Sequence, residues 1–279
     1  MITTPFKDPL FRISQLGRSV FDRAGEAHFD LVAAGVAFYA ILAVFPASAA
    51  VVALWGFLSD PVVLAGQLDT LRPFVPTEAL AILEGQAEAL LSTGRTTLGW
   101  ASALSLLLAL WSTRTGIGAL MRGLNLAFHT EPRRGLNGIV ASFSMTMALV
   151  MVALIAMSSI VVAPLLMLLL PGDAPVGVLR VVRWMITIVV ILLMLSILYR
   201  YGPNHTGPRP TWFSPGTMVA LGLWGIGSAG FTLYLGNFGS YNQVYGSIGA
   251  VIALLMWFFI SAYSVLLGAA LNAELLGEA

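Results

Sequence analysis

The sequence predicts an all-α integral membrane protein, a bundle of six transmembrane helices with an amphipathic helical segment between the first and second helices. Composition is the first reason: 58% of the 279 residues are hydrophobic and 10% are charged. A soluble domain usually has about 25% charged residues, so this chain cannot cover itself with polar surface in water. Six long apolar runs are the second reason. They must be helices, because open strands leave their backbone unsatisfied in lipid.

The apolar runs have about the length that a membrane crossing needs, roughly 20 helical residues for about 30 Å of hydrocarbon. The six expected spans are Leu31–Ser59, Leu98–Met121, Leu136–Leu170, Trp184–Tyr199, Phe213–Gly236 and Ile248–Leu271. The third exceeds one crossing, and we expect Pro164 to bend or end it. The fourth is short, so we expect it to begin earlier, over Val176–Val182.

Basic residues are divided unevenly between the two sides that these spans define. Ten lie on the side that includes the amino terminus, and four lie on the other: Arg72, Arg95, Arg180 and Arg183. The positive-inside rule then puts both termini in the cytoplasm. We expect residues 1–30 to form a cytoplasmic segment without a removable signal peptide, 31–275 one transmembrane domain, and 276–279 a short tail.

The first outside connection, residues 60–97, is long and acidic. Its stretch TEALAILEGQAEALLS places five apolar residues on one helical stripe, namely Leu80, Leu83, Ala87, Leu90 and Leu91. Thr77 is suited to cap that helix. We expect a periplasmic amphipathic helix that lies over the bundle or at the interface; a lid over a cavity is the alternative.

The segment NFGSYNQVYGSIGA, residues 237–250, is polar and uncharged and lies between the last two apolar runs. Its glycines permit tight turns and close helix approach; they include Gly239, Gly246 and Gly249. Four side chains can satisfy irregular backbone where lipid is excluded: Asn237, Tyr241, Asn242 and Tyr245. We expect this segment on the periplasmic side, either as a polar plug in the bundle or as the lining of an outward cavity.

Arg114 lies about one turn inside the cytoplasmic boundary of the second span, and Asn125 follows on the same helical face. Arg114 is a candidate to bind an anionic headgroup, to snorkel to the interface, or to pair with Glu274 or Asp30. In the first span, Pro46 lacks an amide hydrogen, so it is a candidate kink, gating point or packing bend.

Catalytic motifs are absent from the sequence. The three histidines, at 28, 129 and 205, lie in separate segments, there is no cysteine, and no basic face interleaved with aromatics suits nucleic acid. No nucleophile elbow, P-loop or dinucleotide fingerprint is present. No Asp or Glu lies near the middle of a span, which disfavours ion coupling through a buried carboxylate. We expect no enzyme activity, cofactor, metal or nucleic-acid partner.

Several stretches carry a family resemblance: DLVAAGVAFYAILAVFP, ALMRGLNLAFHTEPRR, YRYGPN, WFSPG and, above all, NFGSYNQVYGSIGAVIALLMWFFISAYSVLLGAALNAEL. They resemble the YihY/BrkB family of bacterial inner-membrane proteins, once labelled ribonuclease BN. The resemblance implies six spans, cytoplasmic termini and a place in the inner membrane. In its last stretch, Asn272 and Glu274 are structural candidates, and Ala270 stands where many relatives would carry Glu.

The function expected from these observations is transport or handling of an amphipathic, lipid-like or anionic envelope component. The resemblance adds suggested roles in envelope lipid transport or homeostasis. The alternative is a structural or assembly factor for envelope integrity that transports nothing. Membrane lipids are the expected partners, and a homo-oligomer is an open alternative to a monomer.

Overall fold

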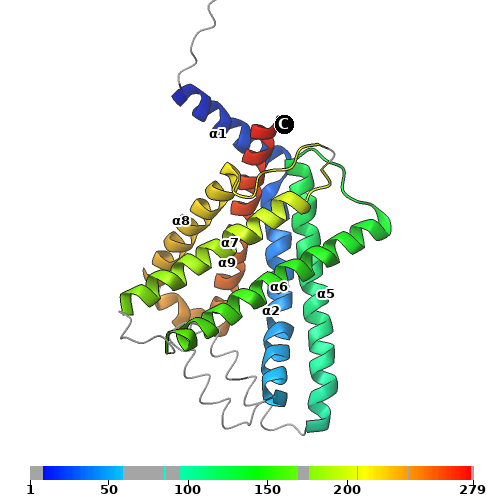
Figure 1. Ribbon diagram of the computed structural model, residues 1–279, viewed down its shortest axis with the longest axis vertical. Coiled ribbons are helices and arrows are strands. Elements are labelled where there is room, and N and C mark those ends of the chain that lie inside the picture. The colour runs from blue at the N-terminus through cyan, green and yellow to red at the C-terminus, as the bar shows by residue number, and fades with distance from the viewer. Residues whose placement is uncertain are drawn as a thin grey trace, which may run out of the picture. The chain divides into compact units, whose positions relative to one another are not determined.

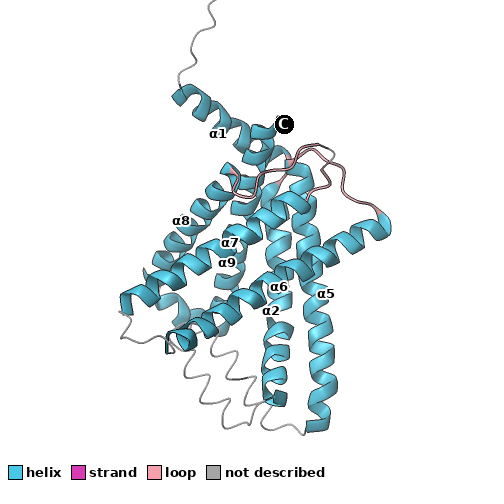
Figure 2. Ribbon diagram, in the orientation of Figure 1, coloured by secondary structure: helices cyan, strands magenta, loops and turns pink. Residues whose placement is uncertain are grey.

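The computed structural model describes residues 9–58, 85, 95–168, 176–205, 207–237 and 239–277. The described residues form α-helices joined by loops, without strands, as Figure 2 shows. The helices, labelled in Figure 1, are α1 (Pro9–Glu26), α2 (Phe29–Leu58), α5 (Arg95–Ala127), α6 (Gly135–Leu168), α7 (Val176–Tyr201), α8 (Pro215–Asn237) and α9 (Gly239–Leu276). The predicted all-α class is confirmed.

Six of these helices are long and apolar enough to cross a membrane. The apolar stretches are Phe29–Ala47, Ala103–Ala127, Gly135–Ala153, Trp184–Tyr201, Pro215–Leu235 and Val251–Leu276, one in each helix from α2 to α9. Large apolar side chains on them face outward, with Ile226 75% exposed and Val140 61% exposed. Such surface is costly in water and suits lipid. The predicted count of six spans is therefore confirmed.

The start of α7 matches the sequence-based expectation, whereas α6 does not end at Pro164. α7 begins at Val176, inside the stretch expected to lengthen the short fourth run. α6 continues through Pro164 and ends at Leu168, and α2 continues through Pro46 to Leu58. The expected amphipathic segment falls outside the described residues, apart from the helical Gly85 and the first residues of α5.

The polar segment at 237–250 differs from expectation in its backbone. We expected the last span to start at Ile248, but α9 starts at Gly239 and includes the polar stretch from that residue onward. Glycine disfavours a helix by about 1 kcal/mol per residue, but a continuous helix satisfies its own backbone hydrogen bonds in lipid. Asn237 is the last residue of α8.

The side chains of this polar segment lie outside what the structure describes, and they include Asn237, Tyr241, Asn242, Tyr245 and the surroundings of Gly246. Gly249 is buried. The plug and the cavity lining therefore both remain predictions, although either would now be built on a helix.

An additional helix, α1, occupies the amino-terminal segment. Apolar residues recur at helical spacing along it, at Leu10, Ile13, Leu16, Val20 and Ala24, and exposed charged residues, Arg18, Asp22 and Glu26, lie on the other face. This periodicity could have predicted the helix. α1 ends in a turn in which His28 has a φ of 48°, and α2 follows directly.

The chain forms two compact units, each described by itself. The first comprises residues 1–34, 117–234 and 259–279, and the second 35–116 and 235–258. In the first unit α6 packs against α7 (Figure 1), and the largest fully buried side chains are Phe29, Leu124, Phe128, Tyr199 and Leu266. In the second unit, α2 approaches α5 where Gly116 leaves room for Tyr39.

α8 and α9 approach each other closely within the first unit. A Cβ added at Gly216 would collide with the carbonyl oxygen of Gly268, and one added at Gly268 would collide with that of Gly216. The amide of Gly216 donates to Oδ1 of the buried Asn272 at 2.9 Å, and the hydroxyl of Tyr199 on α7 donates to the carbonyl of Val265 at 2.8 Å. The glycines thus let the two helix backbones approach closely, and the buried polar contacts hold them together.

Candidate functional site

Two loops of the first unit lie beside each other at the ends of four membrane helices. One joins α5 to α6 and the other joins α7 to α8, and Figure 2 shows both in pink. The buried amide of Asn125 holds them together. Its Oδ1 accepts from the hydroxyl of Thr130 and from the backbone N–H of Asn204, both at 2.8 Å, and its Nδ2 donates to the carbonyl of Met121 at 2.7 Å. Asn125 therefore positions the two loops relative to each other.

Arg133 fixes the second loop from the first. Its Nη1 donates to the carbonyl of Gly202 at 2.9 Å and its Nη2 to that of Pro203 at 3.0 Å. Partial burial, and secondarily the nearby positive charge of Arg209, lower the pKa of Arg133 from its usual range. The two guanidinium groups therefore raise the local positive potential together.

Two arginines and two aromatic residues contact one another at the end of α7 and in the second loop. The guanidinium of Arg209 lies over the ring of Tyr201 (5.4 Å), the edge of Tyr201 meets Trp212 (6.3 Å), and Arg200 lies over Trp212 (5.5 Å). Nη1 of Arg200 also donates to the carbonyl of Pro210 at 2.9 Å. We call Arg200, Tyr201, Arg209 and Trp212 the arginine–aromatic ladder.

Among the described residues, three of the four arginines in this region lack acidic partners, and Arg134, which pairs with Glu131, is the exception. Within the described part of the chain, Arg133, Arg200 and Arg209 form no ion pair with a carboxylate. Structural arginines at a protein surface commonly have a carboxylate nearby, and here backbone carbonyls and aromatic faces position the side chains. Their positive charge is left available to an anion.

An open depression of about 520 Å³ lies beside Arg133. Its lining residues are Glu131, Pro132, Arg133, Arg134, Asn137 and Asn204. Two of these lining residues, Glu131 and Arg134, form an ion pair at 3.0 Å, with both side chains more than four-fifths exposed. The amide of Asn204 donates to the backbone carbonyl of Glu131 at 3.1 Å, which joins the two loops again.

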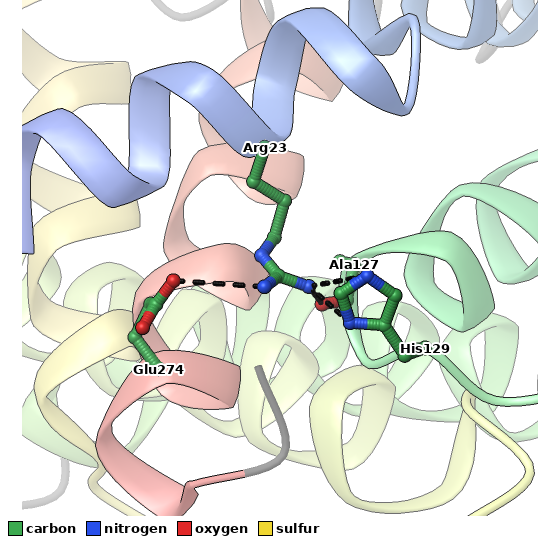
Figure 3. A network of polar contacts seen from close by, with 4 residues as sticks. All are labelled: Arg23, Ala127, His129 and Glu274. Atoms are coloured by element: carbon green, nitrogen blue, oxygen red, sulfur yellow. Dashed lines mark hydrogen bonds and ion pairs between the residues drawn. The ribbon is translucent and has the colours of Figure 1, made fainter.

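A second polar cluster joins α1, the end of α5 and the end of α9 (Figure 3). Arg23 is largely buried; its Nη2 lies 3.6 Å from Oε1 of Glu274, and its Nη1 donates to the carbonyl of Ala127 at 3.1 Å. The same Nη1 lies 2.6 Å from Nδ1 of His129. A guanidinium group can only donate hydrogen bonds, so in this contact the ring nitrogen of His129 is the acceptor. These contacts suit a structural tie.

The residues that the sequence singled out have different surroundings in the structure. Glu274 pairs with Arg23, Arg114 lies over the ring of Trp111 at 5.7 Å, and Asp30 is exposed in the first turn of α2. Asn272 is buried against Gly216. In the described residues no group of three His, Asp or Glu side chains is placed to hold a metal ion.

The loop residues now drawn into the site were missed by reasoning from single spans. Two short stretches of the sequence, HTEPRR and YRYGPN, could have indicated these loops, because each contains arginine next to residues that favour turns. Both connections were expected on the same side of the membrane. Their direct contact depends on Asn125 and Arg133, whose partners are backbone atoms that no residue pattern identifies.

The fold and the position of this site define an α-helical, multi-pass membrane protein. The chain belongs to the family described as Virulence factor BrkB, whose model matches residues 20–278. The chain is 28% identical over 259 residues to the ribonuclease-like protein YfkH of Bacillus subtilis, a match that covers 87% of this chain and 88% of YfkH.

Shorter matches connect the chain to larger membrane proteins. It is 39% identical over 83 residues to a UPF0761 membrane protein of Xanthomonas oryzae pv. oryzae, and 40% identical over 81 residues to UPF0761 membrane protein XAC0937 of Xanthomonas axonopodis pv. citri. These matches span 30% and 29% of this chain and 19% of each relative. No solved structure matches the chain.

Proposed function

We propose that this protein binds and handles a phosphate-bearing, amphipathic component of the envelope within the bacterial inner membrane. The single observation that carries the proposal is a set of three arginines, Arg133, Arg200 and Arg209, that have no carboxylate partner in the described residues and lie near the ends of apolar spans. Arg200 and Arg209 each lie over an aromatic ring, and Arg133 is held by backbone carbonyls.

The depth of these residues suits a lipid headgroup. The apolar stretch of α5 ends at Ala127, that of α6 begins at Gly135, and that of α7 ends at Tyr201. Trp and Tyr concentrate at the membrane–water interface, where their rings reach both phases. Tyr201 and Trp212 therefore mark the interface, and the arginines stacked on them stand at the height of phosphate groups.

Guanidinium groups have the donor geometry that phosphate oxygens require. Arg offers five N–H donors in a planar fork, and it loses less solvation than Lys when it pairs with phosphate. The carbonyl contacts of Arg133 and Arg200 use only some of these donors. Because the guanidinium groups are already oriented, binding an anion requires little reordering of these side chains.

An assembly factor that transports nothing is the second candidate. Two features favour it: the close approach of α8 to α9 at Gly216 and Gly268, and the ion pair between Arg23 and Glu274. Both hold helices rigidly against each other, which suits a structural role. Lipid binding at the arginine–aromatic ladder distinguishes the two candidates. An assembly factor has no need of phosphate selectivity there.

The experiment is lipid retention by the purified protein, measured by native mass spectrometry after exchange into phosphatidylglycerol-containing micelles. Arg209 is exposed, so Arg209→Gln should fold normally and retain less phosphatidylglycerol. One arginine near an anionic surface contributes about 1 kcal/mol, or roughly a fivefold change. The matched control is Arg18→Gln, which removes an exposed arginine already paired with Asp22. Equal retention by the wild type and both variants would refute the proposal.

A further inference from the structure

The lining of the depression combines both signs of charge. Arg133 and Arg134 bring two guanidinium groups, Glu131 one carboxylate, and Asn137 and Asn204 two amides. A site for a purely anionic ligand has no use for a carboxylate, because Glu131 would repel it. The charges instead match a ligand with a cationic and an anionic group close together.

The ion pair between Glu131 and Arg134 leaves both groups available. It joins Oε2 to Nη2 at 3.0 Å, and its side chains are 81% and 83% exposed. Exposed pairs of this kind contribute little to stability, because water competes for both partners. A zwitterionic ligand can therefore insert between them and replace one ion pair with two.

The walls of the depression are built before a ligand arrives. Arg133 is held by the carbonyls of Gly202 and Pro203, and Asn204 is held by Asn125 and by the backbone of Glu131. The volume of about 520 Å³ lies within the range of roughly 300–1,000 Å³ that small-molecule sites occupy. Polar groups fixed in this way can select a ligand by the spacing of its charges.

We propose that the depression binds a phosphate group that carries a primary ammonium, as in a phosphoethanolamine headgroup. The phosphate lies against Arg134 and Arg133, and the ammonium donates to Glu131 and to an amide oxygen of the lining. This inference rests on the proposed function and narrows it from phosphate-bearing amphiphiles to those that also bear an amine. The depression follows the apolar stretch that ends at Ala127, so a bound headgroup leaves its acyl chains beside the spans.

The test compares lipid retention in micelles that contain equal amounts of phosphatidylethanolamine and phosphatidylglycerol, again by native mass spectrometry. Glu131→Gln should lower the retention of phosphatidylethanolamine at least fivefold relative to phosphatidylglycerol. The matched control is Asp22→Asn, which removes an equally solvated carboxylate from the Arg18–Asp22 pair on α1 and should change nothing. Melting temperatures of the variants confirm that each is folded.

The outcomes separate this inference from the proposed function. If Glu131→Gln leaves the lipid ratio unchanged while Arg209→Gln still lowers total lipid, the amine site is wrong and the proposed function stands. If the wild type retains neither lipid above the level of the Arg209→Gln variant, both fail.

Soluble glycerophosphoethanolamine distinguishes the two sources of this headgroup. Displacement of phosphatidylethanolamine by the soluble compound, lost in Glu131→Gln, supports the site and shows that it accepts a ligand without acyl chains. Retention of the lipid in its presence, with the Glu131 dependence intact, supports a membrane-lipid headgroup. Displacement that is independent of Glu131 would overturn the proposal.

Discussion

Arg23 on α1 and Glu274 near the end of α9 form an ion pair with 3.6 Å between Nη2 and Oε1. Both side chains are mostly buried, with 10% and 17% exposed. The residues are far apart in sequence, and their pair ties the amino-terminal helix to the last span. Arg23 is thus the partner that the structure gives Glu274, and a structural role for Glu274 stays a prediction.

Removal of one member of this pair should destabilise the protein more than removal of both. A buried charge left without its partner costs about 3–5 kcal/mol, whereas loss of both charges costs less. We expect Arg23→Gln and Glu274→Gln each to lower the free energy of unfolding in detergent, and the double variant to lose less than the sum. Arg18→Gln with Asp22→Asn is the control, because that pair is exposed. Strictly additive losses at Arg23 and Glu274 would contradict the pairing.

His129 should tolerate a neutral acceptor and reject a cation. Its Nδ1 lies 2.6 Å from Nη1 of Arg23, and its φ is 50°. Asn adopts positive φ readily and supplies an acceptor oxygen, so His129→Asn should be mild. His129→Lys puts a second positive charge beside Arg23 and should cost about 1–3 kcal/mol more, the usual scale for a lost charged hydrogen bond. Denaturation of the two variants in the same detergent is the measurement; equal stability would show that this contact does not form.

Alanine should have opposite effects at two glycines of α8. At Gly216 a methyl group collides with the carbonyl of Gly268 and the side chain of Asn272, whereas at Gly225 it meets open space. Gly216→Ala should destabilise by about 1–3 kcal/mol through overpacking. Gly225→Ala should be neutral or stabilising by up to about 1 kcal/mol, since alanine favours a helix. Melting temperatures in one detergent decide this, and a harmless Gly216→Ala would refute the close approach.

The topology is a prediction from charge. Ten basic residues on one side and four on the other place both termini in the cytoplasm. Reporter fusions after Gly85 and Gly207 should report periplasm and cytoplasm respectively. The reverse pattern would put the arginine–aromatic ladder at the periplasmic surface.

Hydropathy predicted the fold well because lipid permits few alternatives. A long apolar run must be helical, and the short run before Tyr199 could only be completed backwards to Val176, where α7 does begin. The start of α9 was misplaced because polar glycine-rich composition suggested irregular backbone, although helical hydrogen bonding outweighs that local preference in a membrane. α1 was overlooked because its stripe of Leu16, Val20 and Ala24 is short and amphipathic.

Of the residues in the candidate site, the sequence singled out Asn125, and the binding of an anionic headgroup by arginine stays a prediction. The arginine favoured from the sequence was Arg114, chosen for its depth within a span. The structure instead draws attention to Arg133 and Arg209, which lie in loops and are positioned by tertiary contacts, Arg133 by backbone carbonyls and Arg209 by the ring of Tyr201. Such contacts leave no periodic trace in a single sequence, so residue spacing could not have revealed them.

The most direct test of the central claim is to map where phospholipid headgroups contact the protein. A phospholipid with a photoreactive headgroup, reconstituted with the full chain in nanodiscs, should crosslink chiefly to peptides that contain residues 131–137 and 200–212. The yield at these peptides should fall severalfold in Arg209→Gln and stay unchanged in Arg18→Gln. Crosslinks spread evenly over both ends of the spans, with the same yield in Arg209→Gln, would contradict a phosphate-binding role for this site.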